Sequence, residues 1–348
     1  MANKFKSSAT TIPVDRAVGT VLAHDITEIR PGQFKGAAFK RGHIVTEADL
    51  SHLRRVGKEH LYVLHLETGE VHEDEAAVRL AGVLAGKGVC FDPHPSEGKV
   101  RLKADGRGLL KVNVDALTRI NLVPDISCSS IHTNTVVEEG DIIAGLRAIP
   151  LIIDEENLLK AEKIAREGRE VFSVKPFSTP GTGIVITGNE VYSGLVDDKF
   201  APIIRKKLKT FDCKVAGVSF CPDDRRQIAS EIRNHLQRGA EMIVVAGGMS
   251  VDPDDITRVA IADAGAEGVV YGTPVLPGAM FLYGRFGDIP VLGLPACVLF
   301  YRATVFDLIL PRVLAGERIT REDIAAMAHG GMCLDCEQCR FPRCSFGR

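Results

Sequence analysis

The sequence predicts an α/β protein with a three-layer, doubly wound domain built on a parallel sheet, preceded by a smaller mixed α/β region. Strand and helix patterns alternate from residue 183 onward at the interval typical of βαβ units. One of these strands, at 242–246, is apolar throughout, as a central strand buried on both faces is. The 348 residues, 45% of them hydrophobic, suffice for two or three folding units.

The first 68 residues are expected to form a compact opening segment. Residues 1–13 are polar and lack the apolar run of a secretory signal, so we expect a cytoplasmic protein. Thr46 is placed to cap a helix that ends at Gly57. Its apolar residues Leu50, Leu53 and Val56 share one face. A strand is predicted at 61–64.

A small mixed α/β module is expected over residues 69–174. Helices are predicted at 73–84 and 155–167. Short strands are predicted at 111–114, 135–137, 142–144 and 151–153. The polar run at 99–108 favours a solvated hairpin region over a binding patch.

Residues 175–316 are predicted to form the doubly wound domain. Pro176, Pro180 and Gly181 give its start the composition of a linker. Strands at 183–187, 215–220 and 242–246 alternate with helices at 197–211, 224–238 and 256–264. In an open parallel sheet a ligand binds outside the carboxyl ends of the strands, so the loops that follow the strands are where chemistry is expected.

The loop after the third strand reads Gly247-Gly248-Met249-Ser250-Val251-Asp252-Pro253-Asp254-Asp255. Its two glycines let backbone amides approach a ligand closely, and the start of the following helix favours an anionic group. The three aspartates would repel a bare phosphate, so a Mg²⁺ ion between them is the expected resolution. The alternative is an acidic first turn that only caps the helix.

These loops carry a family resemblance. Thr187-Gly188-Asn189-Glu190, the glycine loop, Pro277-Gly278 and Gly293-Leu294-Pro295 resemble the pterin-binding domain of molybdopterin molybdenumtransferase and of the gephyrin E domain. More distant molybdopterin adenylyltransferases share this domain. The resemblance runs from 181 to 314. It implies a magnesium-dependent transferase of molybdenum cofactor biosynthesis that binds molybdopterin or adenylyl-molybdopterin, inserts molybdenum from molybdate with AMP release, and forms a homodimer.

The resemblance also implies roles for individual residues. Asp255 would hold the metal or polarise the phosphoanhydride, and Asp223, in a Pro-Asp step similar to that of the adenylyltransferases, would assist it as the second catalytic residue. The residues expected to bind the cofactor are Thr187, Gly188, Asn189, Glu190, Gly247, Gly248, Ser250, Asp252, Pro277, Gly278, Gly293 and Pro295.

Three departures from the family pattern favour other functions. Residues 13–26 and 42–63 resemble phrases of the non-pterin regions, but the family's Asp-Gly-Tyr-Ala motif is absent near 32–38. Asn189 stands where the transferases usually carry Asp, and Ala296-Cys297-Val298 replaces Gly-Asn-Pro. One alternative is a non-catalytic molybdopterin carrier or sensor that docks on a molybdoenzyme or its maturation partner. A further alternative is a hydrolase of nucleotide fragments.

The tail, residues 317–348, carries a separate signal. Cys333, Cys336, Cys339 and Cys344 place four thiolates at a spacing that predicts a zinc ion or an iron–sulfur cluster. The other five cysteines, Cys90, Cys128, Cys213, Cys221 and Cys297, are expected to be small core residues. A net charge of −2 gives no reason to expect a nucleic-acid partner, and no apolar stretch predicts a membrane span.

Overall fold

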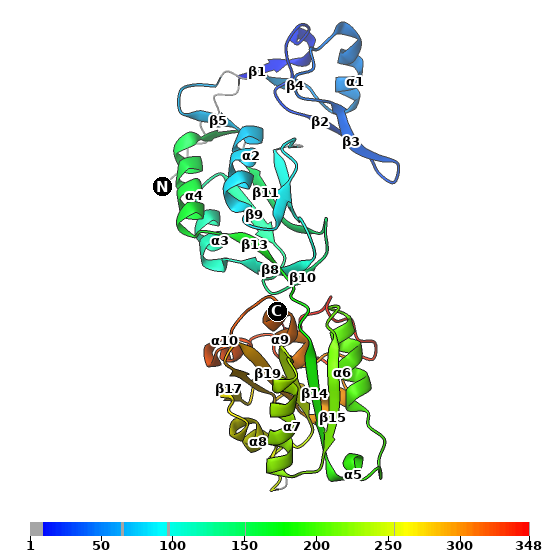
Figure 1. The fold of residues 1–348 in the computed structure, drawn as a ribbon. Coiled ribbons are helices and arrows are strands. Elements are labelled where there is room, and N and C mark those ends of the chain that lie inside the picture. The colour runs from blue at the N-terminus through cyan, green and yellow to red at the C-terminus, as the bar shows by residue number, and fades with distance from the viewer. Residues whose placement is uncertain (1–9, 64–65, 96–97, 150, 254, 348) are drawn as a thin grey trace. The chain divides into compact units, whose positions relative to one another are not determined.

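The computed structural model describes residues 10–63, 66–95, 98–149, 151–253 and 255–347 (Figure 1). The chain divides into two compact units, Met1–Lys175 and Pro176–Arg348. In the first unit, β1 (Thr10–Pro13) pairs antiparallel with β4 (His60–Val63), and β2 (Ile26–Arg30) pairs with β3 (Phe34–Phe39). Leu53 of α1 (Leu50–Arg55) is fully buried among Val14, Ile26 and Phe39, so these elements share a small core.

The predicted helix start at Thr46 is confirmed. The Thr46 amide and hydroxyl donate to the Asp49 carboxylate at 2.8 and 2.7 Å, which closes a capping box ahead of α1. Gly57 follows the helix with a φ of 79°. Of the strand expected at 61–64, residues 61–63 belong to β4, and Leu64 lies outside the described residues.

The rest of the first unit is a mixed α/β fold. The predicted helices are confirmed as α2 (Glu73–Leu84) and α4 (Glu155–Glu167). A four-stranded antiparallel sheet has the order β6 (Val89–Phe91), β7 (Lys99–Ala104), β11 (Ile142–Ala148), β9 (Ile126–Ser130). Smaller sheets comprise β10 (Val136–Val137), β8 (Gly108–Val112) and β13 (Phe172–Pro176), and β12 (Ile152–Asp154) with β5 (Glu70–His72).

Two expectations for this unit are wrong. The run at 99–108 is no solvated hairpin, because β7 pairs with β6 and β11 and buries Val100, Leu102 and Ala104. The strand expected at 111–114 ends at Val112, and Val114 begins α3 (Val114–Asn121). Asn113 caps that helix by accepting from the Ala116 amide at 3.0 Å, which halts the strand.

The second unit is built on a six-stranded sheet. Its order is β15 (Val215–Cys221), β14 (Thr182–Thr187), β16 (Met242–Ala246), β19 (Ile289–Leu294), β18 (Leu282–Phe286), β17 (Glu267–Tyr271). The first four strands are parallel, β18 pairs antiparallel with β19, and β17 pairs antiparallel with β18. The doubly wound fold is thus confirmed, with an antiparallel edge that the prediction of a parallel sheet did not include.

Helices cover both faces of this sheet, which makes three layers (Figure 1). Alternate residues of β14 face opposite cores: Ile184 and Ile186 pack with α6 (Phe200–Lys209) and α9 (Val305–Leu314), and Val185 packs with α7 (Arg225–Gln237) and α8 (Thr257–Asp263). Short elements complete the unit: α5 (Asn189–Tyr192), the 3-10 turn η3 (Ala296–Leu299) and α10 (Arg321–Ala326).

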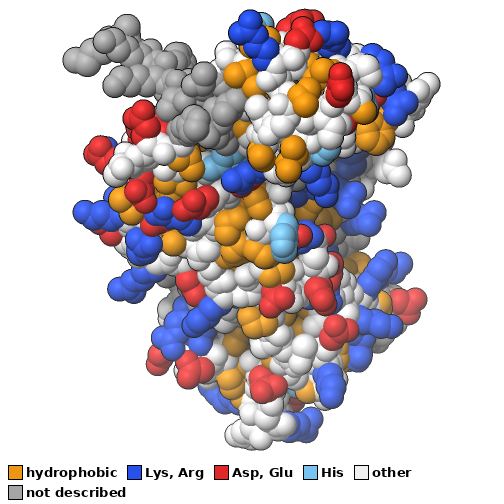
Figure 2. Space-filling model, turned by 90° about the horizontal axis from the view of Figure 1, so that it is seen from above, with side chains coloured by type: hydrophobic (Ala, Val, Ile, Leu, Met, Phe, Trp, Pro, Cys, Tyr) orange, Lys and Arg blue, Asp and Glu red, His pale blue; other side chains and the backbone are white. Residues whose placement is uncertain are grey.

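Surface charge is mixed on the face drawn in Figure 2. Lys and Arg side chains alternate there with Asp and Glu, so neither sign forms a continuous field on that face. Within the described part of the chain, no helix combines the length and the apolar character needed to cross a bilayer.

Candidate functional site

A cavity of about 520 Å³ lies at the carboxyl ends of β16 and β19. We call it the ligand pocket. It lies on one side of β14, from which the chain proceeds first outward to β15 and then to β16 on the other side. Such a reversal of strand order is where open α/β sheets bind ligands. Its lining comes from the segments 247–255, 276–280, 295–301 and 332–335.

The glycine loop, residues 247–250, forms one wall of this pocket. Gly247 and Gly248 have φ values of 102° and 56°. A Cβ on Gly247 would lie 2.3 Å from the Thr187 carbonyl oxygen, and one on Gly248 would lie 2.5 Å from Thr257 Oγ1. Both positions therefore require glycine for conformation and for space.

Three consecutive amides of the glycine loop are left open. Gly248, Met249 and Ser250 donate no backbone hydrogen bond to any acceptor among the described residues. A run of free amides around a concavity is an anion-binding arrangement. The glycine loop is therefore suited to a phosphate at Gly248, Met249 and Ser250, whereas the Gly247 amide donates to the Leu294 carbonyl at 3.4 Å.

Neighbouring side chains hold the glycine loop in place. The buried hydroxyls of Thr187 and Thr257 lie 3.0 Å apart, and the Thr257 amide donates to the Gly248 carbonyl at 3.3 Å. The Tyr271 hydroxyl donates to the Met249 carbonyl at 2.8 Å. Thr187 was expected to bind the cofactor; it is buried behind the loop and positions it.

Asp255 brings a carboxylate to the ligand pocket. It is half-buried, its amide donates to the Asp252 carbonyl at 3.0 Å, and its carboxylate accepts from the Asp252 amide at 3.3 Å. Asp252 is exposed, and Asp254 lies outside the described residues. Of the two described aspartates in this loop, the pocket therefore receives Asp255.

The loops after β14 and β15 are joined by a reciprocal pair. The Asn189 amide donates to the Asp223 carboxylate at 3.0 Å, and the Asp223 amide donates to Asn189 Oδ1 at 3.1 Å. Neither residue belongs to the pocket lining, nor do Gly188 and Glu190 beside them. The two aspartates expected to act together are therefore divided between the ligand pocket and this adjacent pair.

Pro277, Gly278 and Pro295 line the pocket opposite the glycine loop. A Cβ on Gly278 would lie 2.4 Å from Val305 Cγ1, so α9 packs directly behind it. Gly293 lies beneath the pocket, where a Cβ would meet Met249 Cε at 2.6 Å. Cys297 and Tyr301 also line this side, and sequence reasoning placed neither of them in the site.

The tail contributes a wall that sequence reasoning missed. Met332, Cys333 and Asp335, the tail wall, line the ligand pocket. Leu276 pairs with Met332 in a parallel bridge: the Leu276 amide donates to the Gly331 carbonyl at 2.8 Å, and the Cys333 amide donates to the Leu276 carbonyl at 2.8 Å. No local pattern marks this pairing, because its partners lie far apart in the sequence.

The four-cysteine metal site predicted for the tail is not supported. Across the described residues, which include all four cysteines, no three His, Cys, Asp or Glu side chains are grouped to hold a metal ion. Cys333 and Cys344 instead pack against the core beneath α9, whereas Cys336 is exposed. Packing thus separates thiols that the sequence spacing would allow to converge.

The other cysteines divide in two groups. Cys128, Cys213 and Cys221 are buried, and burial raises the pKa of their thiols to about 12, 11 and 11. They are core residues, as expected. Cys90 is exposed and Cys297 is half-buried in the ligand pocket, so the expectation of core positions is wrong for these two.

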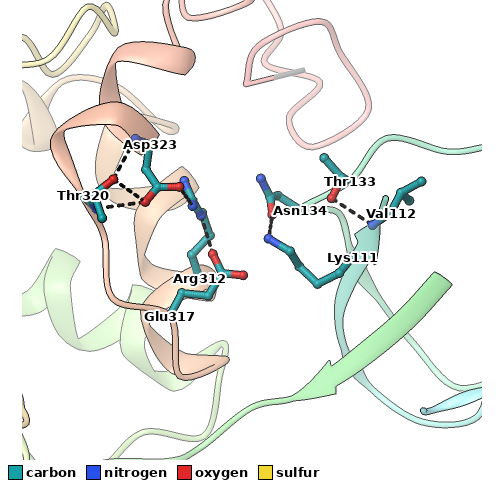
Figure 3. Close-up of polar contacts among 8 residues, drawn as sticks. All are labelled: Lys111, Val112, Thr133, Asn134, Arg312, Glu317, Thr320 and Asp323. Atoms are coloured by element: carbon teal, nitrogen blue, oxygen red, sulfur yellow. Dashed lines mark hydrogen bonds and ion pairs between the residues drawn. The ribbon is translucent and has the colours of Figure 1, made fainter. Parts of the chain in front are cut away.

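A buried arginine fastens the start of the tail. Arg312 of α9 donates to Glu317 at 2.8 Å and to Asp323 of α10 at 2.5 Å, and Asp323 also accepts from Thr320 (Figure 3). Burial alone would lower the pKa of the Arg312 guanidinium, but its two carboxylate partners raise it. The segment that leads into the tail wall is therefore tied to the helix beneath the pocket.

Two family models match parts of the chain. Residues 183–315 match the model described as "Probable molybdopterin binding domain", and residues 11–65 match a domain of unknown function (DUF8806). CinA-like proteins of Mycobacterium tuberculosis H37Ra and Mycobacterium leprae are 35% and 32% identical over 80 residues, 23% of this chain. The chain spans only about a fifth of those relatives, 19% of their length.

Solved structures resemble the chain at low sequence identity. The molybdopterin biosynthesis enzyme MoaB of Thermus thermophilus is 21% identical, covers 40% of this chain and 98% of its own, and has a TM-score of 0.34. A molybdenum cofactor biosynthesis protein of Pyrococcus furiosus covers 92% of this chain and 65% of its own at 12% identity and a TM-score of 0.26. The segment 183–315 is thus similar to the domains described by that model as probable molybdopterin-binding domains.

Proposed function

We propose that the ligand pocket binds molybdopterin or adenylyl-molybdopterin, with the ligand phosphate on the glycine loop. The observation that carries this proposal is the run of open amides at Gly248, Met249 and Ser250 on the pocket wall. An anion held there supplies hydrogen-bond acceptors for amides that have none within the described protein. A cavity of about 520 Å³ lies within the usual size range of cofactor sites.

Asp255 fits the requirement for a magnesium site beside that phosphate. Mg²⁺ is usually held by one or two carboxylates together with phosphate oxygens and waters, so it needs no cage of protein ligands. Asp255 presents a half-buried carboxylate in the same cavity as the open amides. When bound, the ion would neutralise the repulsion between this carboxylate and the ligand phosphate.

The finer proposal is that Asp255 takes part in molybdenum insertion. Release of AMP from adenylyl-molybdopterin breaks the phosphoanhydride bond, and water adds across it to leave two phosphate groups. Asp255 would orient the ligand's phosphates for that step, and the Asn189–Asp223 pair would hold the adjacent loop in place. Asp223 thus supports the site by position.

The test uses anaerobically purified full-length protein with adenylyl-molybdopterin, Mg²⁺ and molybdate. AMP release and the pterin product are followed by chromatography for the wild type, Asp255→Asn and the exposed control Asp252→Asn. We expect molybdate-dependent AMP release by the wild type and the control, and its loss in Asp255→Asn. Turnover of ADP-ribose in place of the pterin would show a hydrolase of nucleotide fragments instead.

A second candidate function is that of a molybdopterin carrier or sensor. It is favoured by the hydrogen bonds between Asp223 and Asn189. The Asp223 carboxylate accepts from the Asn189 amide and Asp223 does not line the pocket, so Asp255 would act there without Asp223. Tight binding of adenylyl-molybdopterin without AMP release would establish the carrier. Absence of any pterin binding would refute both candidates.

A further inference from the structure

The tail wall belongs to the ligand pocket although the molybdopterin-binding segment ends before it. That segment covers residues 183–315, whereas Met332, Cys333 and Asp335 line the cavity. A ligand in the pocket therefore meets side chains that lie outside the matched domain. The charge and hydrogen-bonding capacity of these side chains determine which part of a ligand they can bind.

Backbone hydrogen bonds and packing fix the tail wall to the rest of the second unit. Its backbone pairs with Leu276 on both sides of Met332, and the Gly347 amide donates to the Gly330 carbonyl at 2.9 Å. Phe346 is buried with 3% exposure and its ring contacts that of Phe341. Gly331 has no space for a side chain, since a Cβ there would lie 2.4 Å from the Met327 carbonyl oxygen. Met332 to Asp335 are thus held from both ends.

Each side of the pocket carries a carboxylate, Asp255 or Asp335, but the glycine loop also carries open backbone amides. The glycine loop offers open amides, which suit an anion. The tail wall offers the Met332 thioether and the Asp335 carboxylate, and Tyr301 lies on the same cavity. A carboxylate repels a phosphate but accepts hydrogen bonds from neutral N–H groups. The phosphate therefore belongs at the glycine loop and a flat, N–H-bearing group at the tail wall.

We propose that Asp335 and Met332 bind the ring of the pterin, with the Asp335 carboxylate accepting from the ring's amino group and adjacent ring N–H. The 2-amino-4-oxo pyrimidine edge of a pterin presents these two donors side by side, which a carboxylate accepts together. Met332, 68% exposed, supplies a polarizable thioether for the ring face. This inference rests on the proposed binding of molybdopterin and makes the tail a specificity element for its ring.

The ring edge also defines the test, because lumazine has an oxygen where pterin has the amino group. Dissociation constants of pterin-6-carboxylate and lumazine-6-carboxylate are measured by ligand fluorescence, to which a protein without Trp adds little background. Molybdopterin binding is measured alongside under anaerobic conditions. The proteins are the wild type, Asp335→Asn and Glu337→Gln, an exposed tail residue that does not line the pocket.

Asp335→Asn tests the charge of the carboxylate without altering the fold of the tail. Asp335 has a φ of 48°, a conformation that Asn adopts readily, so Asp335→Asn keeps the backbone and the side-chain shape while removing the charge. We expect the wild type and Glu337→Gln to prefer the pterin over the lumazine by about tenfold, or about 1.4 kcal/mol. Asp335→Asn should reduce that preference to about twofold and weaken molybdopterin binding.

The outcomes separate the two proposals. A wild type that binds molybdopterin but does not distinguish pterin from lumazine, or an Asp335→Asn variant that keeps the preference, overturns the tail wall's role and leaves the proposed function intact. A wild type that binds no molybdopterin overturns the proposed function as well. Equal effects of Asp335→Asn and Glu337→Gln would likewise overturn the tail wall's role, because they would reflect tail charge alone.

Discussion

At the scale of single residues, the ligand pocket depends on positions where only glycine fits. Gly247 combines a φ of 102° with a Cβ position 2.3 Å from the Thr187 carbonyl oxygen. Gly194 in the same unit has a φ of 74° but open space around its Cβ position. Alanine substitution at Gly194 would therefore incur only the conformational strain of a positive φ, whereas substitution at Gly247 would add a steric clash.

We expect Gly194→Ala to destabilise the second unit by about 1 kcal/mol, and Gly247→Ala by about 2–4 kcal/mol because a backbone clash is added to the strain. Urea unfolding of the two variants measures the difference, and molybdopterin binding should be lost in Gly247→Ala alone. Equal destabilisation would mean that the glycine loop moves aside without cost.

Thiol reactivity provides a second residue-scale prediction. Burial, aided by Glu231, raises the pKa of the Cys221 thiol to about 11, so about 0.1% of it is thiolate at pH 8. Cys336 is exposed. Iodoacetamide at pH 8 should therefore label Cys336 quickly and Cys221 only after unfolding, as mass spectrometry of timed samples would show. Similar labelling rates in the folded protein would contradict the buried position of Cys221.

At the scale of elements, a buried histidine lies where α7 packs against β14 and β15. His235 is buried, Gly183 and Gly217 leave space for its ring, and Ser219 Oγ lies 3.0 Å from its Nε2. Burial lowers the pKa of His235 from its ordinary 6.5, so the ring stays neutral when folded. Below about pH 6.5 the unfolded chain takes up a proton that the folded one does not.

The free energy of unfolding should therefore fall as pH decreases from 6.5 toward the lower folded pKa, and this contribution should be fully present above 6.5. Hydrogen exchange of β14 peptides between pH 5 and 8 follows the second unit alone. His235→Gln, which retains a partner for Ser219, should flatten the pH dependence. An unchanged slope would assign the pH dependence to other groups.

A helix cap precedes the tail wall in the sequence. Thr320 accepts from the Asp323 amide at 3.1 Å at the start of α10, and Asp323 also pairs with Arg312. Thr320→Ala should cost about 1 kcal/mol and speed hydrogen exchange at 331–333. Thr46→Ala removes the capping box of the first unit and serves as the control, which should leave exchange at 331–333 unchanged. Faster exchange there in both variants would contradict a local effect.

At the scale of the whole molecule, local patterns predicted the elements better than their pairing. Helices α2 and α4 begin and end at the predicted residues. The partners of β7 and the bridge of Leu276 to Met332 are non-local, so no spacing in the sequence indicates them. The glycine loop was predictable because its backbone conformation and close packing restrict two neighbouring positions to glycine, whereas Tyr301 and Asp335 join the pocket lining from segments distant in the sequence.

The division of the chain into two units yields a last prediction. Every residue that lines the ligand pocket lies between Gly247 and Asp335, within the unit Pro176–Arg348. A fragment of residues 177–348 keeps the whole six-stranded sheet and the tail wall, and it should bind molybdopterin with a dissociation constant within about twofold of the full chain. Calorimetric titration of both proteins measures this, with Asp335→Asn in the fragment as the control for binding at the same pocket. Loss of binding by a folded fragment would show that residues 1–176 contribute to binding, and the missing contacts would then be sought among those residues.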